Sequence, residues 1–326
     1  MKFSNSPWFI AFGTFALALA ACSSSGDNDS NGTGGGGGAG NAAGGNASGG
    51  KTTGTLSGNV KVELFPADQY ATVSAQIFDG PIPNGEPLDV ADELNGCQLL
   101  IPRSITCSPE CGTTSVCTGN NQCTPKPMPK NVGVIHVQGL SSMAIDMDPL
   151  PPNFSYSGPT LQETYPPCTE GDDIKVQSDL FSITGKCITS LTLGGPTPIP
   201  VMSGSPVHLT WTAPGKANIS RIQIELEISH HGGYKGEIDC DVPDTGSFDI
   251  PERLVTALIA RGRAGYPTVK VTRLASASAP NESNVKLIMP SLVERAVDTG
   301  VISCGGQDSP PCPSGMTCSD FERICK

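Results

Sequence analysis

Short stretches in which apolar and polar residues alternate begin near residue 56 and recur through most of the chain. The clearest is 222–228, where four aliphatic side chains alternate with Gln223, Glu225 and Glu227. Successive side chains of a β-strand point to opposite faces of a sheet, so this pattern predicts a strand with one buried and one wet face. The same pattern predicts strands at 59–64, 71–78, 132–138, 174–177, 181–184, 191–193, 207–211 and 268–274.

One segment has the spacing of a helix instead. Pro251 suits a first helical position, Leu254, Leu258 and Ile259 share one face, and Gly262 can end the helix. Strands separated by turns rich in Pro and Gly predict a mainly β protein, an Ig-like or related β-sandwich with this one short helix. The 39 Gly, 29 Pro and 5% aromatic residues agree with a loop-rich β fold.

The beginning of the chain has a different pattern. Lys2 is followed by an apolar run at 8–19, which is too short for a comfortable permanent span of a bilayer, and then by Leu19-Ala20-Ala21-Cys22. These four residues resemble the lipobox of bacterial lipoproteins, in which the cysteine is acylated and becomes the first mature residue. The resemblance implies a signal peptide at 1–21, with Leu19, Ala20 and Ala21 read by the signal peptidase and Cys22 lipidated. The alternative is an ordinary cleaved signal that has a cysteine beside it.

A flexible tether is expected at 22–55. Residues 23–55 contain no Val, Ile, Leu or aromatic residue and are dominated by Gly, Ser, Asn and Ala, so they have no apolar face to bury. No later stretch is apolar over the length of a spanning helix, so we expect attachment to the membrane through the lipid alone. The residue after Cys22 is Ser23 and not Asp. This resembles the pattern of lipoproteins that are sent to the outer membrane of Gram-negative bacteria, so we expect the protein there, on the periplasmic face or at the cell surface.

The cysteine count suits an exported protein. Thirteen cysteines less Cys22 leave an even number, enough for six disulfides in an oxidising compartment. Two clusters with similar spacing predict two copies of one small module, each held by two disulfides because it is too short for a hydrophobic core. The first copy has Cys107, Cys111, Cys117 and Cys123, and the second has Cys304, Cys312, Cys318 and Cys325.

The four remaining cysteines, Cys97, Cys168, Cys187 and Cys240, are expected to tie loops to the sandwich, and Cys168 with Cys187 is the first pairing we expect. The expected organisation is a β-sandwich at 56–303 with a Cys-rich insertion at about 97–127, followed by a Cys-rich module at 304–326. Neither cluster has Cys-x2-Cys or a nearby Cys/His pair at zinc spacing, which argues against a metal.

The net charge of the chain argues against one class of binding partner. A net charge of −11 and a pI of about 4.8 argue against nucleic acid, because binding phosphates needs clustered Lys and Arg.

Several motifs together carry a family resemblance. They are the lipobox, the Gly-rich tether, Cys-Pro-Ser-Gly-Met-Thr-Cys at 312–318, and the run from Leu209 through Asp244-Thr245-Gly246-Ser247 to Pro251. With these motifs the chain resembles a group of uncharacterised myxobacterial cysteine-rich lipoproteins. The resemblance implies export and lipid anchoring and brings no activity with it.

Two Asp-Thr-Gly tripeptides, beginning at Asp244 and Asp298, match the active-site sequence of aspartic proteases, whose two carboxylates share a proton. The copies lie too close in sequence for two large lobes, and Asp-Thr-Gly is also ordinary turn chemistry. The weak candidates for calcium ligands are Asp239, Asp241, Asp244 and Asp249, in an acidic turn without EF-hand spacing, with Asp172 and Asp173 weaker still. His230 and His231 precede two glycines and are expected in a surface turn.

The sequence therefore predicts a lipid-anchored envelope or cell-surface protein with a structural or binding role. An extracellular protein or glycan is the expected partner, and no catalytic residue, metal or cofactor is expected. The alternatives are an extracellular hydrolase using Asp244 and Asp298, and a calcium-stabilised adhesion module.

Overall fold

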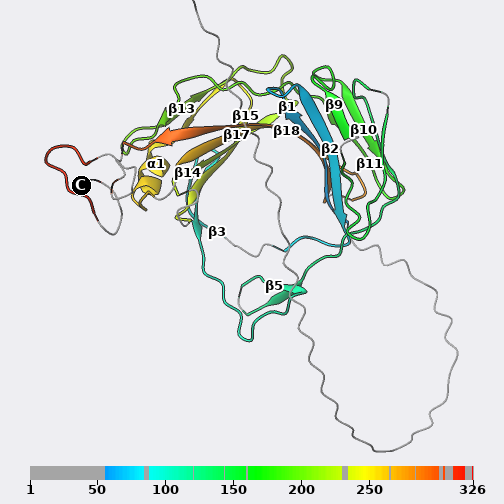
Figure 1. Ribbon diagram of the computed structural model, residues 1–326, viewed down its shortest axis with the longest axis horizontal. Helices are drawn as coiled ribbons and strands as arrows, with labels where there is room; N and C mark the ends of the chain where they lie inside the picture. The colour runs from blue at the N-terminus through cyan, green and yellow to red at the C-terminus, as the bar shows by residue number, and fades with distance from the viewer. Residues whose placement is uncertain are drawn as a thin grey trace, which may run out of the picture. The chain divides into compact units, whose positions relative to one another are not determined.

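A ten-stranded sheet is the main element of the protein (Figure 1). The computed structural model describes residues 56–83, 88–119, 121–142, 144–158, 161–229, 234–263, 266–282, 284–300, 304, 311–319 and 325. The proposed signal peptide and tether, and the pair His230 and His231, lie outside the described residues.

The main sheet is mostly antiparallel, but β1 runs parallel to β18. In spatial order its strands are β3 (Leu88–Leu94), β4 (Cys97–Pro102), β15 (Glu237–Pro243), β14 (Arg221–Glu227), β17 (Thr268–Ser278), β18 (Val285–Asp298), β1 (Ser57–Phe65), β2 (Tyr70–Phe78) and β9 (Gln162–Thr164), with β12 (Ile199–Pro200) pairing with β18.

Smaller elements complete the fold. One four-stranded sheet has the order β11 (Ser182–Lys186), β10 (Asp173–Gln177), β7 (Ile135–Gln138), β8 (Ile145–Met147). Two short pairs are β13 (Val207–Thr210) with β16 (Ser247–Ile250) and β5 (Ser115–Cys117) with β6 (Cys123–Pro125). The one helix among the described residues is α1 (Glu252–Ile259). The mainly β fold with one short helix is therefore confirmed.

The buried apolar residues form two separate clusters. The first core joins β1 and β2 to the sheet of β7, β8, β10 and β11. The second core joins β4, β14 and β15 to β13, β16 and α1. Burial of apolar side chains in these two cores is the main favourable contribution to the free energy of folding.

The long hairpin of β17 and β18 belongs to both cores. Val269 and Val271 of β17 lie in the second core, whereas Ala275, four residues after Val271, lies in the first. On β18, Met289 lies in the first core and Val297 in the second. These two strands therefore make one continuous sheet out of what would otherwise be two sandwiches.

Most predicted strands are present, and β14 has the predicted alternation, with Ile222, Ile224 and Leu226 at most 1% exposed. Helix α1 begins at Glu252, so Pro251 is its N-cap and not its first residue. Strands β15 and β18 were not predicted. The acidic turn expected at Asp239 to Asp241 is in fact part of β15, whose apolar residues Ile238, Cys240 and Val242 point into the second core.

The strand predicted at 191–193 is reduced to a single antiparallel bridge between Leu193 and Trp211, and side chains bind the neighbouring backbone groups. The N–H of Leu191 donates to Ser291 Oγ at 2.8 Å, and the carbonyl of Leu193 accepts from Arg295. Leu191 and Leu193 are nevertheless buried in the second core, which explains their apolar pattern.

All twelve cysteines after Cys22 form six disulfides. The pairs are Cys97 with Cys240, Cys107 with Cys117, Cys111 with Cys123, Cys168 with Cys187, Cys304 with Cys318, and Cys312 with Cys325. The expected pairing of Cys168 with Cys187 is confirmed. Cys97 belongs to β4 and pairs with Cys240 directly across the β4–β15 ladder, so it is not part of the Cys-rich module that follows.

The two Cys-rich modules have the same connectivity. In each, the first cysteine pairs with the third and the second with the fourth. The third and fourth cysteines also face each other across a β-ladder or bridge in both copies. Shared spacing, connectivity and pairing support two copies of one module.

The Cys168–Cys187 disulfide should matter more for stability than those of the modules, because Cys187 is fully buried in the first core. We expect Cys168→Ala with Cys187→Ala to lower the free energy of the main unfolding transition by about 3 kcal/mol, because the loop that this disulfide closes unfolds together with the first core. Thermal unfolding measures the effect. Cys107→Ala with Cys117→Ala is the matched control and should leave the main transition unchanged, so an equal loss in both variants would contradict this assignment.

Candidate functional site

The first candidate, Asp244, lies in a buried ion pair. Its Oδ2 is 2.6 Å from Nε of Arg273, and the two side chains are 2% and 1% exposed. Trp211 Nε1 donates to Asp244 Oδ1 at 2.7 Å, and Ser220 Oγ donates to Oδ2 at 2.7 Å. The carboxylate is therefore held as a structural anion, with its oxygens occupied by internal donors.

The guanidinium of Arg273 is equally well satisfied. It donates to the carbonyl oxygens of Ser190, at 3.0 Å, and Thr212, in addition to Asp244. A buried charge is tolerated only when paired and hydrogen-bonded, and both charges here meet that condition.

Asp298 lies far from Asp244. Arg273 faces Ser291 across the ladder, and β18 continues from Ser291 to Asp298 over about 23 Å at about 3.3 Å per residue. Asp298 Oδ1 instead accepts the N–H of Gly300 at 2.8 Å within its own turn. Two carboxylates that share a proton must be in near contact, so this pair does not form an aspartic-protease dyad.

Three of the four calcium candidates have separate partners, and the fourth, Asp239, has an oxygen without one. Asp239 and Asp241 lie on β15, where Asp241 Oδ1 accepts from Arg221 Nε at 2.6 Å. Asp249, on β16, is 2.5 Å from Nδ1 of His208, and Asp244 is paired with Arg273. They do not converge on one cation.

Cysteine sulfurs form the only clusters of three potential metal ligands in the described part of the chain. These clusters are Cys107, Cys111 and Cys117, and Cys304, Cys312 and Cys325. All of these sulfurs are in disulfides, so they offer no thiolate to a metal.

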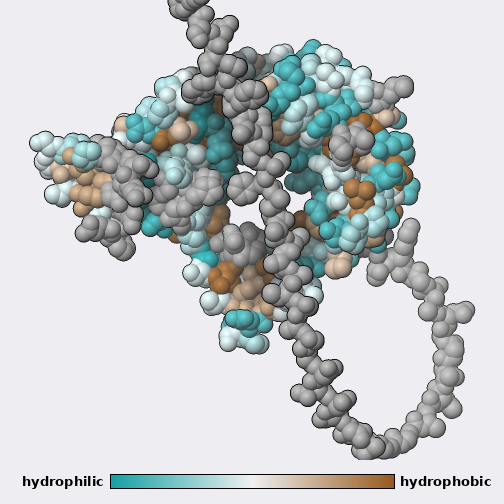
Figure 2. Space-filling model, viewed as in Figure 1, coloured by the Kyte–Doolittle hydropathy of each residue, from teal (hydrophilic) through white to brown (hydrophobic). Residues whose placement is uncertain are grey.

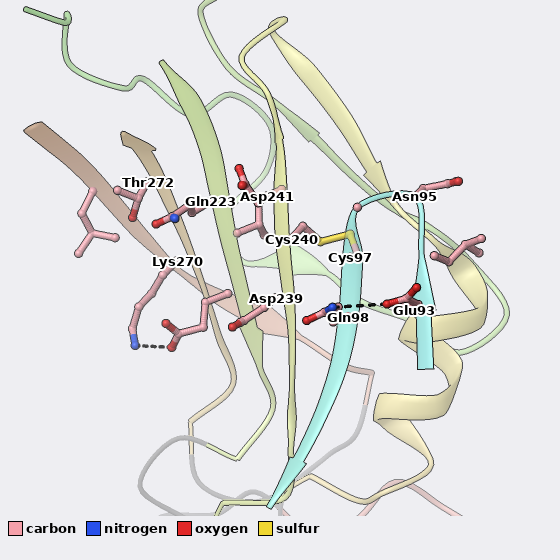
Figure 3. A pocket seen from close by; sticks show the side chains of 15 residues that line it. Glu93, Asn95, Cys97, Gln98, Gln223, Asp239, Cys240, Asp241, Lys270 and Thr272 are labelled. Atoms are coloured by element: carbon pink, nitrogen blue, oxygen red, sulfur yellow. Dashed lines mark hydrogen bonds and ion pairs between the residues drawn. A yellow bond between two sulfur atoms is a disulfide. The ribbon is translucent and has the colours of Figure 1, made fainter. Parts of the chain in front are cut away.

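A groove of about 990 Å³ lies on the face of the main sheet that points away from the second core (Figure 3). It extends over β3, β4, β15, β14, β17 and β18. The polar side chains that line it are Glu93, Asn95, Gln98, Gln223, Glu225, Asp239, Asp241, Lys270 and Thr272.

These side chains form a row across the sheet because the ladders place them directly opposite one another. Gln98 faces Asp239, Asp239 faces Glu225, and Glu225 faces Lys270. Figure 3 shows Gln98, Asp239 and Lys270 at the same level on their strands. Lys270 Nζ donates to Glu225 Oε1 at 2.6 Å, whereas the solvent-shielded Oδ1 of Asp239 has no hydrogen-bond partner.

Like charges face one another in this part of the sheet. Glu225 lies opposite Asp239, and two register positions further along the ladder Glu227 lies opposite Glu237. Like charges directly opposite across a ladder are destabilising. Burial raises the pKa of Asp239 to about 6, with Glu225 adding to the effect, and burial together with Asp239 raises the pKa of Glu237 to about 7.

The groove was not predicted, although a signal for it was present. The alternation of Ile238, Cys240 and Val242 with Glu237, Asp239 and Asp241 marks a strand as clearly as that of β14 does. The alternation does not say which strand β15 pairs with, so the sequence could not place β15 beside β14.

The search for known relatives finds no match for this chain among protein-family models, curated proteins or solved structures. The candidate site therefore rests on its own geometry and chemistry.

The buried ion pair predicts a large effect of Asp244→Asn. We expect this change to lower the free energy of unfolding by about 3–5 kcal/mol, because it leaves the Arg273 guanidinium buried without a counter-charge. Denaturant unfolding gives the value. Asp298→Asn, at the second Asp-Thr-Gly, should change stability by about 0.5 kcal/mol or less. Equal effects of the two changes would show that the ion pair has no special role.

The raised pKa values predict how stability depends on pH. An acid with a higher pKa in the folded state binds more protons folded than unfolded, so its contribution to stability falls as pH rises. For Asp239 and Glu237 this loss runs from about pH 4, near their ordinary pKa values, to about pH 7. We therefore expect Asp239→Asn with Glu237→Gln to raise Tm by a few degrees at pH 8, but to change it little at pH 4.

Melting curves between pH 4 and pH 8 test this expectation. The charged groups that face the pair are Glu225, Glu227 and Lys270, and Tyr234 hydrogen-bonds to Glu237. Asn and Gln can still accept hydrogen bonds, so the change removes mainly charge. Asp68→Asn with Asp148→Asn, which removes two exposed carboxylates outside the groove, is the control. If the variant with both Asp239→Asn and Glu237→Gln were less stable than wild type at pH 8, the prediction would be contradicted.

Proposed function

We propose that the protein is an exported lipoprotein, anchored through acyl chains on Cys22, that holds a disulfide-stabilised β-sandwich at the cell envelope and has a structural or binding role. The outer membrane is the proposed location, on the evidence of Ser23 and the resemblance to myxobacterial lipoproteins. Lipid attachment does not require a spanning helix, and among the described residues no helix is long and apolar enough to cross a membrane.

The disulfide pattern is the observation that carries the proposal. Twelve of the thirteen cysteines pair with one another, which leaves Cys22 without a cysteine partner in its own chain. Six disulfides suit an oxidising compartment outside the cytoplasm. The thirteenth cysteine lies where the lipobox resemblance requires the acylated residue.

A binding role is supported by the groove on the main sheet. Ligands usually bind in concave sites, where convergent polar groups fix their orientation. On the face in Figure 2, hydrophilic residues predominate and hydrophobic ones form small separate patches, which favours polar recognition over a broad apolar contact.

Changing Cys22 tests the anchor. We expect Cys22→Ala to abolish incorporation of radiolabelled palmitate and to move the protein from the detergent phase to the aqueous phase, because no other lipid attachment is proposed. Ser23→Asp is the matched control. It should keep the label and move the protein from the outer to the inner membrane fraction. A Cys22→Ala protein that stays labelled and membrane-bound would overturn the proposal.

A further inference from the structure

We propose that the groove binds a basic, extended segment of a partner protein through its Lys or Arg side chains. This inference rests on the binding role proposed above and names the class of partner.

The groove has room for such a segment. Its volume is about 990 Å³, and it extends over six neighbouring strands, from β3 to β18. Neighbouring strands lie about 4.8 Å apart, so the groove is about 24 Å long across the sheet, roughly the length of seven extended residues. Gln98, Gln223 and Thr272 provide uncharged groups that can hydrogen-bond to a backbone.

The charge of the lining favours a cationic ligand. Four carboxylates, those of Glu93, Glu225, Asp239 and Asp241, line the groove with one ammonium group, Lys270. Lys270 is already paired with Glu225, and Arg221 is paired with Asp241. Glu93 accepts a hydrogen bond from Gln98 at 3.4 Å, and neither Glu93 nor Asp239 forms an ion pair among the described residues, so the deficit of positive charge lies at these two carboxylates.

A bound cation would also remove an internal conflict. Glu225 and Asp239 face each other directly, and Lys270 pairs with Glu225 but not with Asp239. Conflicts between local chemistry and stability are concentrated at functional sites. A second ammonium or guanidinium group, beside Asp239, would supply the counter-charge that Lys270 supplies to Glu225.

The groove also has apolar surface beside its carboxylates. Such a surface suits the side chains of Lys and Arg, which have hydrocarbon stems, better than it suits a metal ion. Leu94 and Leu292 line the groove and are 36% and 48% exposed, so they can cover the hydrocarbon stems of long basic side chains. None of the described lining residues is aromatic, so the groove has no ring on which a sugar could stack. Its carboxylates are also not among the clusters close enough to share a metal ion.

The test measures binding of fluorescent heptalysine to the full-length protein in detergent, by anisotropy at low ionic strength. We expect saturable binding that weakens with salt, and no binding of heptaglutamate. Glu93→Gln with Asp239→Asn should weaken binding about tenfold, the effect of losing about 1.4 kcal/mol over two ion pairs. Asp146→Asn with Asp249→Asn removes the same formal charge outside the groove and should leave Kd within about twofold.

Each outcome decides the proposal. Equal weakening in both double variants would mean that heptalysine responds only to the overall negative charge, and would overturn it. Spermidine binding as tightly as heptalysine would make the groove a small-polyamine site, which also overturns it. Asp239→Asn is expected to stabilise the fold, so lost binding in its variant is not explained by unfolding. Palmitate labelling of Cys22 tests the lipid anchor independently of the groove. If Cys22 is labelled but heptalysine does not bind, the proposed basic partner is refuted and the proposed lipid anchor is not.

Discussion

The buried ion pair of Arg273 with Asp244 lies where the two cores meet. On the inner face of β17, Arg273 lies between Val271, which belongs to the second core, and Ala275, which belongs to the first. An apolar residue at this position would either leave a cavity between the two cores or have to pack against both of them. A guanidinium with five donors instead fixes several chain segments at once, through Asp244 and the carbonyls of Ser190 and Thr212. The geometry of the junction depends on this one cation.

Neighbouring contacts strengthen the same junction. The segment between β11 and β13 passes over the hairpin of β17 and β18, and three hairpin side chains bind its backbone. Arg273 binds the carbonyl of Ser190, Ser291 binds the N–H of Leu191, and Arg295 binds the carbonyl of Leu193. Buried backbone groups must find partners, and here side chains supply them where no strand does. The two sandwiches are therefore joined by a polar seam as well as by continuous strands.

The predictable part of the fold is the part that local pattern determines. Alternation identified β14 and the first half of β17, because one face of each is buried and the other is wet. It overestimated 191–193, where the same apolar spacing comes from burial and only one antiparallel bridge forms, between Leu193 and Trp211. The partner of Asp244 was also beyond the sequence, because Arg273 is a distant residue that is brought near only when β14 pairs with both β15 and β17. Asp-Thr-Gly at 244–246 therefore resembled a catalytic motif, although its carboxylate has a structural partner.

Two aspartates close in sequence show how the environment decides the chemistry of a carboxylate. Asp244 is almost fully buried, yet it has a guanidinium, an indole N–H and a hydroxyl around it, so its charge is compensated inside the protein. Asp239 is less buried, but it faces Glu225 and has one oxygen without a donor, so burial and repulsion both act against its charged form. The first arrangement is closed to a ligand because every strong donor is internal. The second is open to one, because Lys270 pairs with Glu225 and leaves Asp239 without an ion pair of its own. This difference, rather than the number of acidic residues, makes the groove and not the Asp-Thr-Gly turn the place to expect a partner.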